Sequence, residues 1–469
     1  MRRNMTPTQM ARADRCLHAW YLECHGDPAW KTEPSAGTRL LWERGNEHER
    51  QVIALLPSCV EPQWEHSDWE AGLAVTIELM KQGVSWIYQA PLFREDVYGK
   101  PDLLERIEIP SLLGGHSYRP VDIKGHKEVK RKDRIQLAAY AWMLEPLLGH
   151  RPKEGAIWLN TGEREPVDLV RLVADFEELH AAMGRVRDKP GETAGYRCGE
   201  CRLCDWSEHC WQQWQEKASV CLVCGVTGDT ARKLVTNGVD DFHKLAALQP
   251  AELCRRFNFS RNRAESMIQH AKARVLGKHI TKAPLPDHGD RPIIHYDIET
   301  YRQTVYLHGL LVCRGDQRSE HSYLARHPDQ ERQAWHELLD FLAKFPDAVV
   351  YNWADYERGH ANRLREDHGG NPDGWRLLDQ QMFDLCQVVK ETAVLPVATY
   401  SIKEVAPVFG FEWQAEDAGG LNSEAWYGEW LATGDETVLE KIVEYNLDDV
   451  RAMVTSYLAL SDALPRKKK

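Results

Sequence analysis

The sequence predicts an α/β protein of several domains, in which two strand-and-helix domains flank a short helical region. The chain has 469 residues, which is enough for two or three domains. Short apolar strands that carry acidic residues alternate with helix-period segments near both ends. A proline-rich segment at 283–292 has the composition of a linker. We therefore expect domains at 1–215, 216–282 and 293–469, with that linker before the last one.

The bulk composition is ordinary for a globular chain and sets few limits on function. Hydrophobic residues make up 43% and charged residues 28%, and no run of about 18 apolar residues could span a membrane. The basic N-terminus lacks the apolar core of a secretory signal, so we expect a cytoplasmic protein with no membrane partner. The net charge of −12 gives no support for nucleic-acid binding, although the stretch 124–134 is locally basic.

The first domain is expected to place acidic and basic side chains on one strand. We expect helices at 8–23, 38–56 and 131–148, and strands at 84–93 and 118–125. Because side chains alternate along a strand, Asp122 and Lys124 share a face. Carboxylates that hold Mg²⁺ or Mn²⁺ beside a lysine suit phosphodiester cleavage. The candidate residues of this domain, in chain order, are His48, Asp102, Asp122, Lys124, Gln136 and Tyr140.

That ordered set resembles the RecB-family nucleases of the PD-(D/E)xK, or restriction-endonuclease-like, fold. The motifs are Gly-x-x-His, Gly-x-Pro-Asp, Asp-x-Lys and Gln-x-x-x-Tyr, and the resemblance covers about residues 1–215. It implies that His48, Asp102 and Asp122 bind the metal, and that Lys124, Gln136 and Tyr140 complete the catalytic site. The chain departs from the commoner Glu-x-Lys by using Asp122.

Clustered cysteines indicate a metal site, because a cytoplasmic chain with twelve cysteines is not expected to form disulfides. One early cysteine and a late C-x-x-C-x5-C are similar to the iron–sulfur RecB-like exonucleases, including the CRISPR-associated kind and the AddB group. That resemblance implies a [4Fe–4S] cluster on Cys16, Cys201, Cys204 and Cys210. Two zinc alternatives stay open: Cys201 and Cys204 with Cys221 and Cys224, or Cys198 in place of Cys16.

The middle region is expected to be helical. Residues 222–239 resemble a helix–hairpin–helix module, whose glycine turn opens a helix with free amides that suit a backbone phosphate. A second helical pair, rich in arginine, is expected at 250–277. The alternative is a helical spacer without a role in binding.

The last domain is expected to begin with a strand at 292–299 and a second strand at 306–313, followed by a strand at 349–351 and helices at 356–366 and 437–460. Asp297 and Glu299 are two residues apart and therefore point the same way. Tyr445 and Asp449 are four apart on the last helix and share a face. Asn352-x-x-Asp355 lies between these two pairs.

The order Asp-x-Glu, Asn-x-x-Asp, Tyr-x-x-x-Asp resembles the DEDD exonucleases of the RNase H-like fold, in their tyrosine variant, over about residues 290–460. The resemblance implies that Asp297, Glu299, Asp355 and Asp449 hold two metal ions and that Tyr445 orients the attacking water. The Asn-to-Asp spacing here is shorter than usual, and Ala354 stands where an aromatic is common. Glu357 and Asp384 are therefore alternatives to Asp355.

These resemblances together imply a metal-dependent DNA exonuclease with two nuclease domains. It would act on single strands or duplex ends with Mg²⁺ or Mn²⁺, in DNA repair, phage defence or CRISPR-type processing, and a helicase or CRISPR or repair proteins would be its partners. Two alternatives stay open. One is a DNA-binding adaptor with a structural cluster that works with a helicase or integrase, and the other is a nuclease that acts on RNA.

Overall fold

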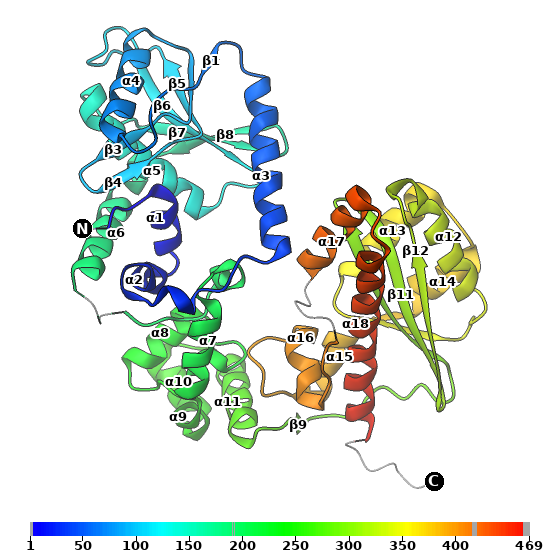
Figure 1. Cartoon of the computed structure of the whole chain (residues 1–469). Helices are drawn as coiled ribbons and strands as arrows, with labels where there is room; N and C mark the ends of the chain where they lie inside the picture. The colour runs from blue at the N-terminus through cyan, green and yellow to red at the C-terminus, as the bar shows by residue number, and fades with distance from the viewer. Residues whose placement is uncertain (1–2, 190, 192, 415–419, 463–469) are drawn as a thin grey trace. The chain divides into compact units, whose positions relative to one another are not determined.

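The chain divides into two compact units (Figure 1). The computed structural model describes residues 3–189, 191, 193–414 and 420–462. The first unit comprises Met1–Glu33 and Arg39–Trp211, and the second comprises Pro34–Thr38 and Gln212–Lys469. The helical middle region therefore groups with the last domain. Among the described residues, no helix combines the length and the apolar character needed to cross a membrane.

Two helices replace the single one expected at 8–23. Thr6 caps the first helix, α1 (Pro7–Ala13), and Pro7 opens it. Cys16 then adopts a non-helical backbone conformation and starts α2 (Leu17–His25), so this cysteine stands at a break between helices. The other helices that begin in this unit or at its edges are α3 (Ala36–Ala54), α4 (Trp69–Lys81), α5 (Arg131–Leu148), α6 (Val173–Asp188) and α7 (Ser207–Glu216).

A six-stranded mixed sheet forms the centre of the first unit, in the order β1-β2-β5-β6-β7-β8. Its strands are β1 (Cys59–Val60), β2 (Trp86–Tyr88), β5 (Leu103–Ile107), β6 (Ser117–Lys124), β7 (Glu154–Leu159) and β8 (Arg164–Asp168). The strand expected at 84–93 is two strands, because Gln89 takes a left-handed conformation after β2. The second of them, β3 (Leu92–Arg94), pairs instead with β4 (Val97–Gly99).

The central strand β6 is antiparallel to β5 and parallel to β7, and the crossover between β6 and β7 runs through α5. Apolar residues of α5 pack with Tyr118 and Leu104 on one face of the sheet. Val121 and Ile123 pack on the opposite face. Alternation therefore turns Asp122 and Lys124 toward the same face of the sheet, the one that α5 covers.

The middle region is a bundle of short helices, α8 (Gly228–Thr236), α9 (Phe242–Ala247), α10 (Pro250–Phe257) and α11 (Arg261–Leu276). Left-handed conformations at Gly225 and Asn258 precede α8 and α11. Arg274 donates to the carbonyl of Leu222 at 2.9 Å, which ties α11 to the start of this region. In the segment 283–292, the ring of His288 hydrogen-bonds the Tyr351 hydroxyl at 2.7 Å, so this segment packs on the last domain.

The last domain is built on a five-stranded sheet in the order β12-β11-β10-β13-β14. Its strands are β10 (Ile293–Tyr301), β11 (Thr304–Arg314), β12 (Gln317–Leu324), β13 (Val349–Asn352) and β14 (Met382–Asp384). The first three strands are antiparallel, and β13 and β14 run parallel to β10. A separate short pair joins β9 (Ile280–Thr281) to β15 (Ala393–Val394).

Helices cover both faces of this sheet (Figure 1). On one face lie α12 (Glu331–Leu342) and α14 (Pro372–Gln381), packed on Ile294, Tyr296 and Ile298. The long α18 (Glu436–Asp462) runs along the other face. The remaining helices are α13 (Tyr356–His368), α15 (Leu385–Thr392), α16 (Ile402–Val405) and α17 (Gly420–Thr433). Since Asp297 and Glu299 alternate with the apolar residues of β10, they face α18.

Candidate functional site

Two carboxylates lie side by side on β5 and β6 of the first unit. Asp102 directly precedes Leu103, which pairs with Val121 across the two strands, and Asp102 Oδ2 accepts the amide of Ile123 at 2.7 Å. Asp122 is fully buried, and neither of its carboxylate oxygens has a hydrogen-bond partner. The ammonium of Lys124 lies 3.1 Å from Oδ2. A buried carboxylate with free lone pairs beside a second one fits a divalent cation.

The close packing of these charged groups shifts the pKa values of Asp102 and Lys124. Burial and the negative charge of Asp122 raise the pKa of Asp102 to about 8, although Lys124 opposes the shift. Burial by itself would lower the pKa of Lys124, but Asp122 and Asp102 raise it above the usual value. The lysine is therefore charged, whereas Asp102 resists ionisation. A bound cation would relieve that repulsion.

The other residues predicted for this site lie on two helices, Gln136 and Tyr140 on α5 and His48 on α3. The Tyr140 hydroxyl donates to the carbonyl of Lys100 at 2.8 Å, and Gln136 Nε2 lies 3.5 Å from that hydroxyl. On α3, His48 Nε2 is buried without a hydrogen-bond partner. An unpaired ring nitrogen is available as a ligand.

A carboxylate that the sequence prediction missed, Glu49, also belongs to this site. Gln89 Nε2 donates to Glu49 Oε1 at 2.9 Å and lies 3.3 Å from Asp102 Oδ1, so one amide bridges the two carboxylates. The negative charge of Glu49 also contributes to the raised pKa of Asp102. The only signal in the sequence is that Glu49 follows His48, and an adjacent His-Glu pair does not by itself indicate a metal site.

Three of the cysteines around the expected cluster lie close together. Cys198 Sγ is 3.9 Å from Cys201 Sγ, and Cys198 also hydrogen-bonds Cys16. These bonds lower the pKa of Cys198 and raise the pKa values of Cys16 and Cys201. Cys204 Sγ accepts a hydrogen bond of 2.8 Å from Arg12. The structure thus brings Cys198 next to two of the predicted ligands.

The fourth predicted ligand, Cys210, is buried on α7. A side chain at Gly195 would lie 3.5 Å from its sulfur. Cys221 is also buried, beside the middle region, and belongs to the second compact unit together with Cys224.

Three carboxylates of the last domain converge between β10 and α18. Asp297, Glu299 and Asp449 each offer a ligand oxygen, and these atoms all lie within 4.8 Å of one another. Across the part of the chain that the structure describes, no other group of three histidine, cysteine or acidic ligands is as tight. Burial raises the pKa of Glu299 to about 8, and burial with the charge of Asp449 raises the pKa of Asp297. Such a crowded acidic group fits divalent cations with oxygen ligands.

Neutral donors hold these carboxylates in place. Ser423 on α17 donates to Glu299, and Asn446 on α18 donates to Asp297 Oδ2 at 2.8 Å. Tyr445 is buried, and burial together with the nearby carboxylates raises its pKa. The Tyr445 hydroxyl is hydrogen-bonded to Asp449, which places it at the predicted position beside the acidic group.

Residues 294–460 match the family model of the RNase_H superfamily. This segment is an RNase H-like domain. The match covers the five-stranded sheet and α18 except for the first residue of β10 and the last two of α18, and so includes every carboxylate of the second site. A search of the curated proteins found no match to the chain.

In the RNase H-like domain, the fourth acidic residue next to Asp297 is Glu357. Glu357 is 3% exposed, accepts a hydrogen bond of 2.9 Å from Asn352, and is also hydrogen-bonded to Asp297. Burial raises its pKa to about 7. The predicted Asp355 is instead exposed at the start of α13. Asp384, the other alternative, accepts the amides of Ala354 and Gln387 and so caps α15.

A sequence signal for Glu357 does exist. It stands further from Asn352 than Asp355 does, and Tyr356 supplies the aromatic that often precedes the acidic residue. The sequence prediction placed Asp355 first and kept Glu357 as an alternative.

Two further groups of the RNase H-like domain bind Asp449, and the sequence gave no sign of either. Lys403 Nζ and Trp413 Nε1 donate to Asp449 Oδ1, at 2.5 and 2.8 Å. The Lys403 ammonium also lies 4.4 Å from the ring centres of Trp413 and Tyr445. Cation–π contact on two sides holds this lysine over the acidic group.

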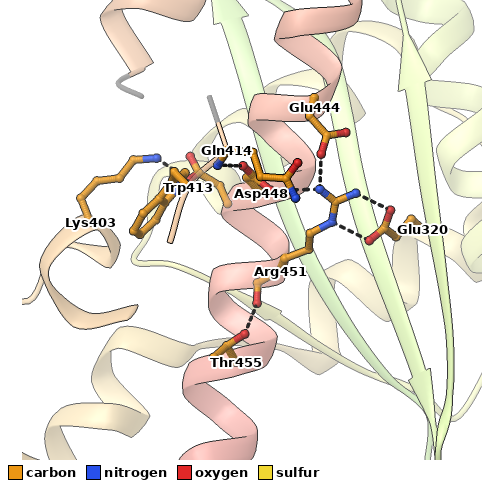
Figure 2. A network of polar contacts seen from close by, with 9 residues as sticks. Glu320, Lys403, Trp413, Gln414, Glu444, Asp448, Arg451 and Thr455 are labelled. Atoms are coloured by element: carbon orange, nitrogen blue, oxygen red, sulfur yellow. Dashed lines mark hydrogen bonds and ion pairs between the residues drawn. The ribbon is translucent and has the colours of Figure 1, made fainter. Parts of the chain in front are cut away.

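The neighbouring residue, Asp448, has binding partners of its own, as Figure 2 shows. Arg451 binds Glu320 of β12 at 2.7 Å and Asp448 at 2.9 Å, and also pairs with Glu444. The amide of Gln414 donates to Asp448 Oδ2 at 2.8 Å. Asp448 is therefore fully engaged, which leaves Asp449 as the acidic residue of this turn that joins the cluster.

Proposed function

We propose that this protein is a metal-dependent nuclease with two active sites, one in each compact unit. The observation that carries the proposal is the group formed by Asp297, Glu299 and Asp449 in an RNase H-like domain, a family whose members generally hydrolyse nucleic acids with divalent metals. Glu357 is proposed as the fourth acidic ligand in place of Asp355. Mg²⁺ or Mn²⁺ bound here would supply charge stabilisation for an in-line displacement at phosphorus.

In this proposal the protein groups bind, orient and neutralise. The carboxylates of β10 and α18 would hold the cations, and the Tyr445 hydroxyl would orient the attacking water. Lys403 is 30% exposed at its side chain and can reach a phosphate oxygen from its place over Tyr445. An ammonium near the scissile phosphate would stabilise the negative charge that develops there.

We propose a second, PD-(D/E)xK-type site in the first unit. It is supported by the β5–β6 hairpin, the parallel crossover through α5, and the buried Asp122 carboxylate, whose Oδ1 has no partner. Asp102, Asp122 and His48 would hold the cation, with Glu49 as an added acidic group. Lys124, ion-paired with Asp122, would act on the attacking water or on the developing charge.

The test is cleavage of end-labelled single-stranded DNA and RNA with Mn²⁺ or Mg²⁺. Asp122→Asn and Asp297→Asn each remove one negative charge with almost no change in shape, and each is expected to abolish the products of one site. The double variant is expected to be inactive. Asp316→Asn changes an exposed turn residue and is the matched control. A double variant as active as the parent would show that neither site carries the activity.

We further propose that Cys16, Cys201 and Cys204 bind a metal with either Cys210 or Cys198. Cys210 completes the predicted [4Fe–4S] set. The 3.9 Å between Cys198 and Cys201 favours zinc with Cys198 as a ligand, because two thiolates on one tetrahedral zinc lie about 3.8 Å apart. This set keeps Cys16 and so differs from both zinc alternatives that the sequence left open. Anaerobically purified protein would be brown with a cluster and colourless with one zinc per chain. Metal analysis of Cys198→Ser and Cys210→Ser would identify the fourth ligand.

A second candidate function is a nucleic-acid-binding adaptor whose carboxylates no longer catalyse, working with a helicase or integrase partner. The observation in its favour is the ion pair of Lys403 with Asp449, because an ammonium already neutralises one acidic residue. Tight DNA binding that is the same with EDTA and with Mn²⁺, and no cleavage under either condition, would favour this function.

A further inference from the structure

Asn446 links the two strand carboxylates of the C-terminal site. It is fully buried on α18, one residue after Tyr445. Its Nδ2 donates to Asp297 Oδ2 at 2.8 Å. The Asn446 side chain is also hydrogen-bonded to Glu299 and thereby lowers the pKa of that carboxyl, against the effect of burial. One neutral donor therefore holds both acidic residues of β10.

The room for this side chain comes from a glycine on the next strand. Gly309 of β11 pairs directly with Asp297 across the antiparallel ladder. A Cβ at position 309 would lie 1.8 Å from Asn446 Oδ1, a separation that atoms do not tolerate. A side chain on Gly309 and the observed position of Asn446 are therefore mutually exclusive.

The other end of the amide has no polar partner. Asn446 Oδ1 is buried without a hydrogen bond, and it faces the position where a side chain at 309 would be. A buried polar atom without a partner destabilises a fold and calls for an explanation. The two donor contacts to metal-binding carboxylates provide one, because an apolar residue of the same size would fill the space at no such cost.

We propose that Asn446 is a positioning residue, which holds Asp297 and Glu299 in the orientation that binds metal, and that Gly309 is required for it. The inference rests on the proposed function only in taking these carboxylates as metal ligands. Donors that fix ligating carboxylates commonly change metal affinity by 10–100-fold when they are removed.

The experiment measures Mn²⁺ affinity of the full chain by electron paramagnetic resonance, in an Asp122→Asn background that silences the first site. Asp297→Asn defines the loss of the second site. Asn446→Leu keeps the branched shape but cannot donate, and we expect Mn²⁺ affinity to fall at least about tenfold with the fold retained. Ser456→Ala removes a buried hydroxyl that bonds only its own helix, and this control is expected to bind as the parent does.

The role of Gly309 is tested by a double-mutant cycle with Gly309→Ala and Asn446→Ala. Each change by itself is expected to lower Mn²⁺ affinity, and the double variant is expected to bind no more weakly than Asn446→Ala, because the clash has been removed. If the fold-losses of Mn²⁺ affinity in the two single variants multiply in the double variant, Gly309 is not required for the role of Asn446. Parent-like affinity in folded Asn446→Leu and Asn446→Ala would overturn the positioning role.

The outcomes also separate this inference from the proposed function. If the cycle behaves as expected but the parent cleaves neither DNA nor RNA, the nuclease proposal fails and the positioning role stands. If cleavage depends on Asp297 while the Asn446 variants bind and cleave as the parent does, the nuclease proposal stands and the positioning role fails.

Discussion

The ammonium nitrogen of Lys403 lies 2.5 Å from Oδ1 of Asp449, with its charge against the rings of Trp413 and Tyr445. An ammonium so placed competes with a metal ion for one carboxylate and, once displaced, is available to a phosphate. The two roles have opposite effects: the first weakens metal binding, and the second raises the rate of cleavage. If the lysine has both roles, its loss is expected to strengthen metal binding and weaken turnover, whereas loss of a purely structural lysine is expected to weaken both.

Lys403→Met, in the Asp122→Asn background, is therefore expected to bind Mn²⁺ about fivefold more tightly, which corresponds to an ion pair of about 1 kcal/mol. We expect kcat for single-stranded DNA to fall on the order of 10²-fold, as when a charge-stabilising group is removed. Manganese titration and initial rates measure both. Lys441→Met, an exposed lysine over the Trp426 ring, is the control. Weaker Mn²⁺ binding by Lys403→Met would contradict this role.

Glu357→Gln is expected to abolish most activity of the RNase H-like domain, because the buried carboxylate beside Asp297 would no longer bear a charge. Asp355→Asn, two residues away and exposed, is expected to retain parent activity. Initial rates with Mn²⁺ compare the pair directly. If Asp355→Asn is inactive and Glu357→Gln is active, Asp355 and not Glu357 is the fourth metal ligand.

The acidic group makes the stability of the metal-free protein fall as pH rises. The pKa of Glu299 is 4.5 when exposed and about 8 in the fold, so the folded state holds the extra proton between these values. Stability is highest near the lower value and is lost as pH rises toward about 8. In EDTA, Glu299→Gln should make this slope shallower and add on the order of 2 kcal/mol at pH 8. Thermal unfolding from pH 5 to 8.5 measures it.

Glu337→Gln, at an exposed position, is the control for that series and should follow the parent. Mn²⁺ is expected to raise the melting temperature of the parent more at pH 8 than at pH 5.5, because protons and metal compete for the same oxygens. A parent protein whose stability in EDTA rises between pH 5 and 8 would contradict the raised pKa values.

Glu49→Gln tests the acidic residue that joins the first site through Gln89. We expect it to lower Mn²⁺ affinity and kcat of that site by about tenfold, measured in the Asp297→Asn background. Glu47→Gln is the matched control, since Glu47 lies two residues earlier on α3 and is exposed, with partners only on its own helix. Equal effects of the two substitutions would mean that Glu49 acts only through the charge of the helix surface.

The sequence by itself determined the parts of both sites that lie on single elements. A period of two along β6 and β10 is enough to place Asp122 with Lys124, and Asp297 with Glu299, because alternation is a property of any extended strand. A period of 3.6 likewise placed Tyr445 with Asp449 on α18, and helix bounds at 131–148 agree with α5. Local geometry fixes these relationships before any packing is considered.

Tertiary structure decided everything that depends on how elements approach one another. Glu357 rather than Asp355 lies beside Asp297 because the left-handed turn at Ala354 sets where α13 begins. Lys403, Trp413 and Asn446 reach the acidic group from elements more than 100 residues along the chain from β10, and Glu49 meets Asp102 through Gln89. Such contacts arise when side chains that are distant in the sequence pack together. Local sequence periodicity carries no information about them.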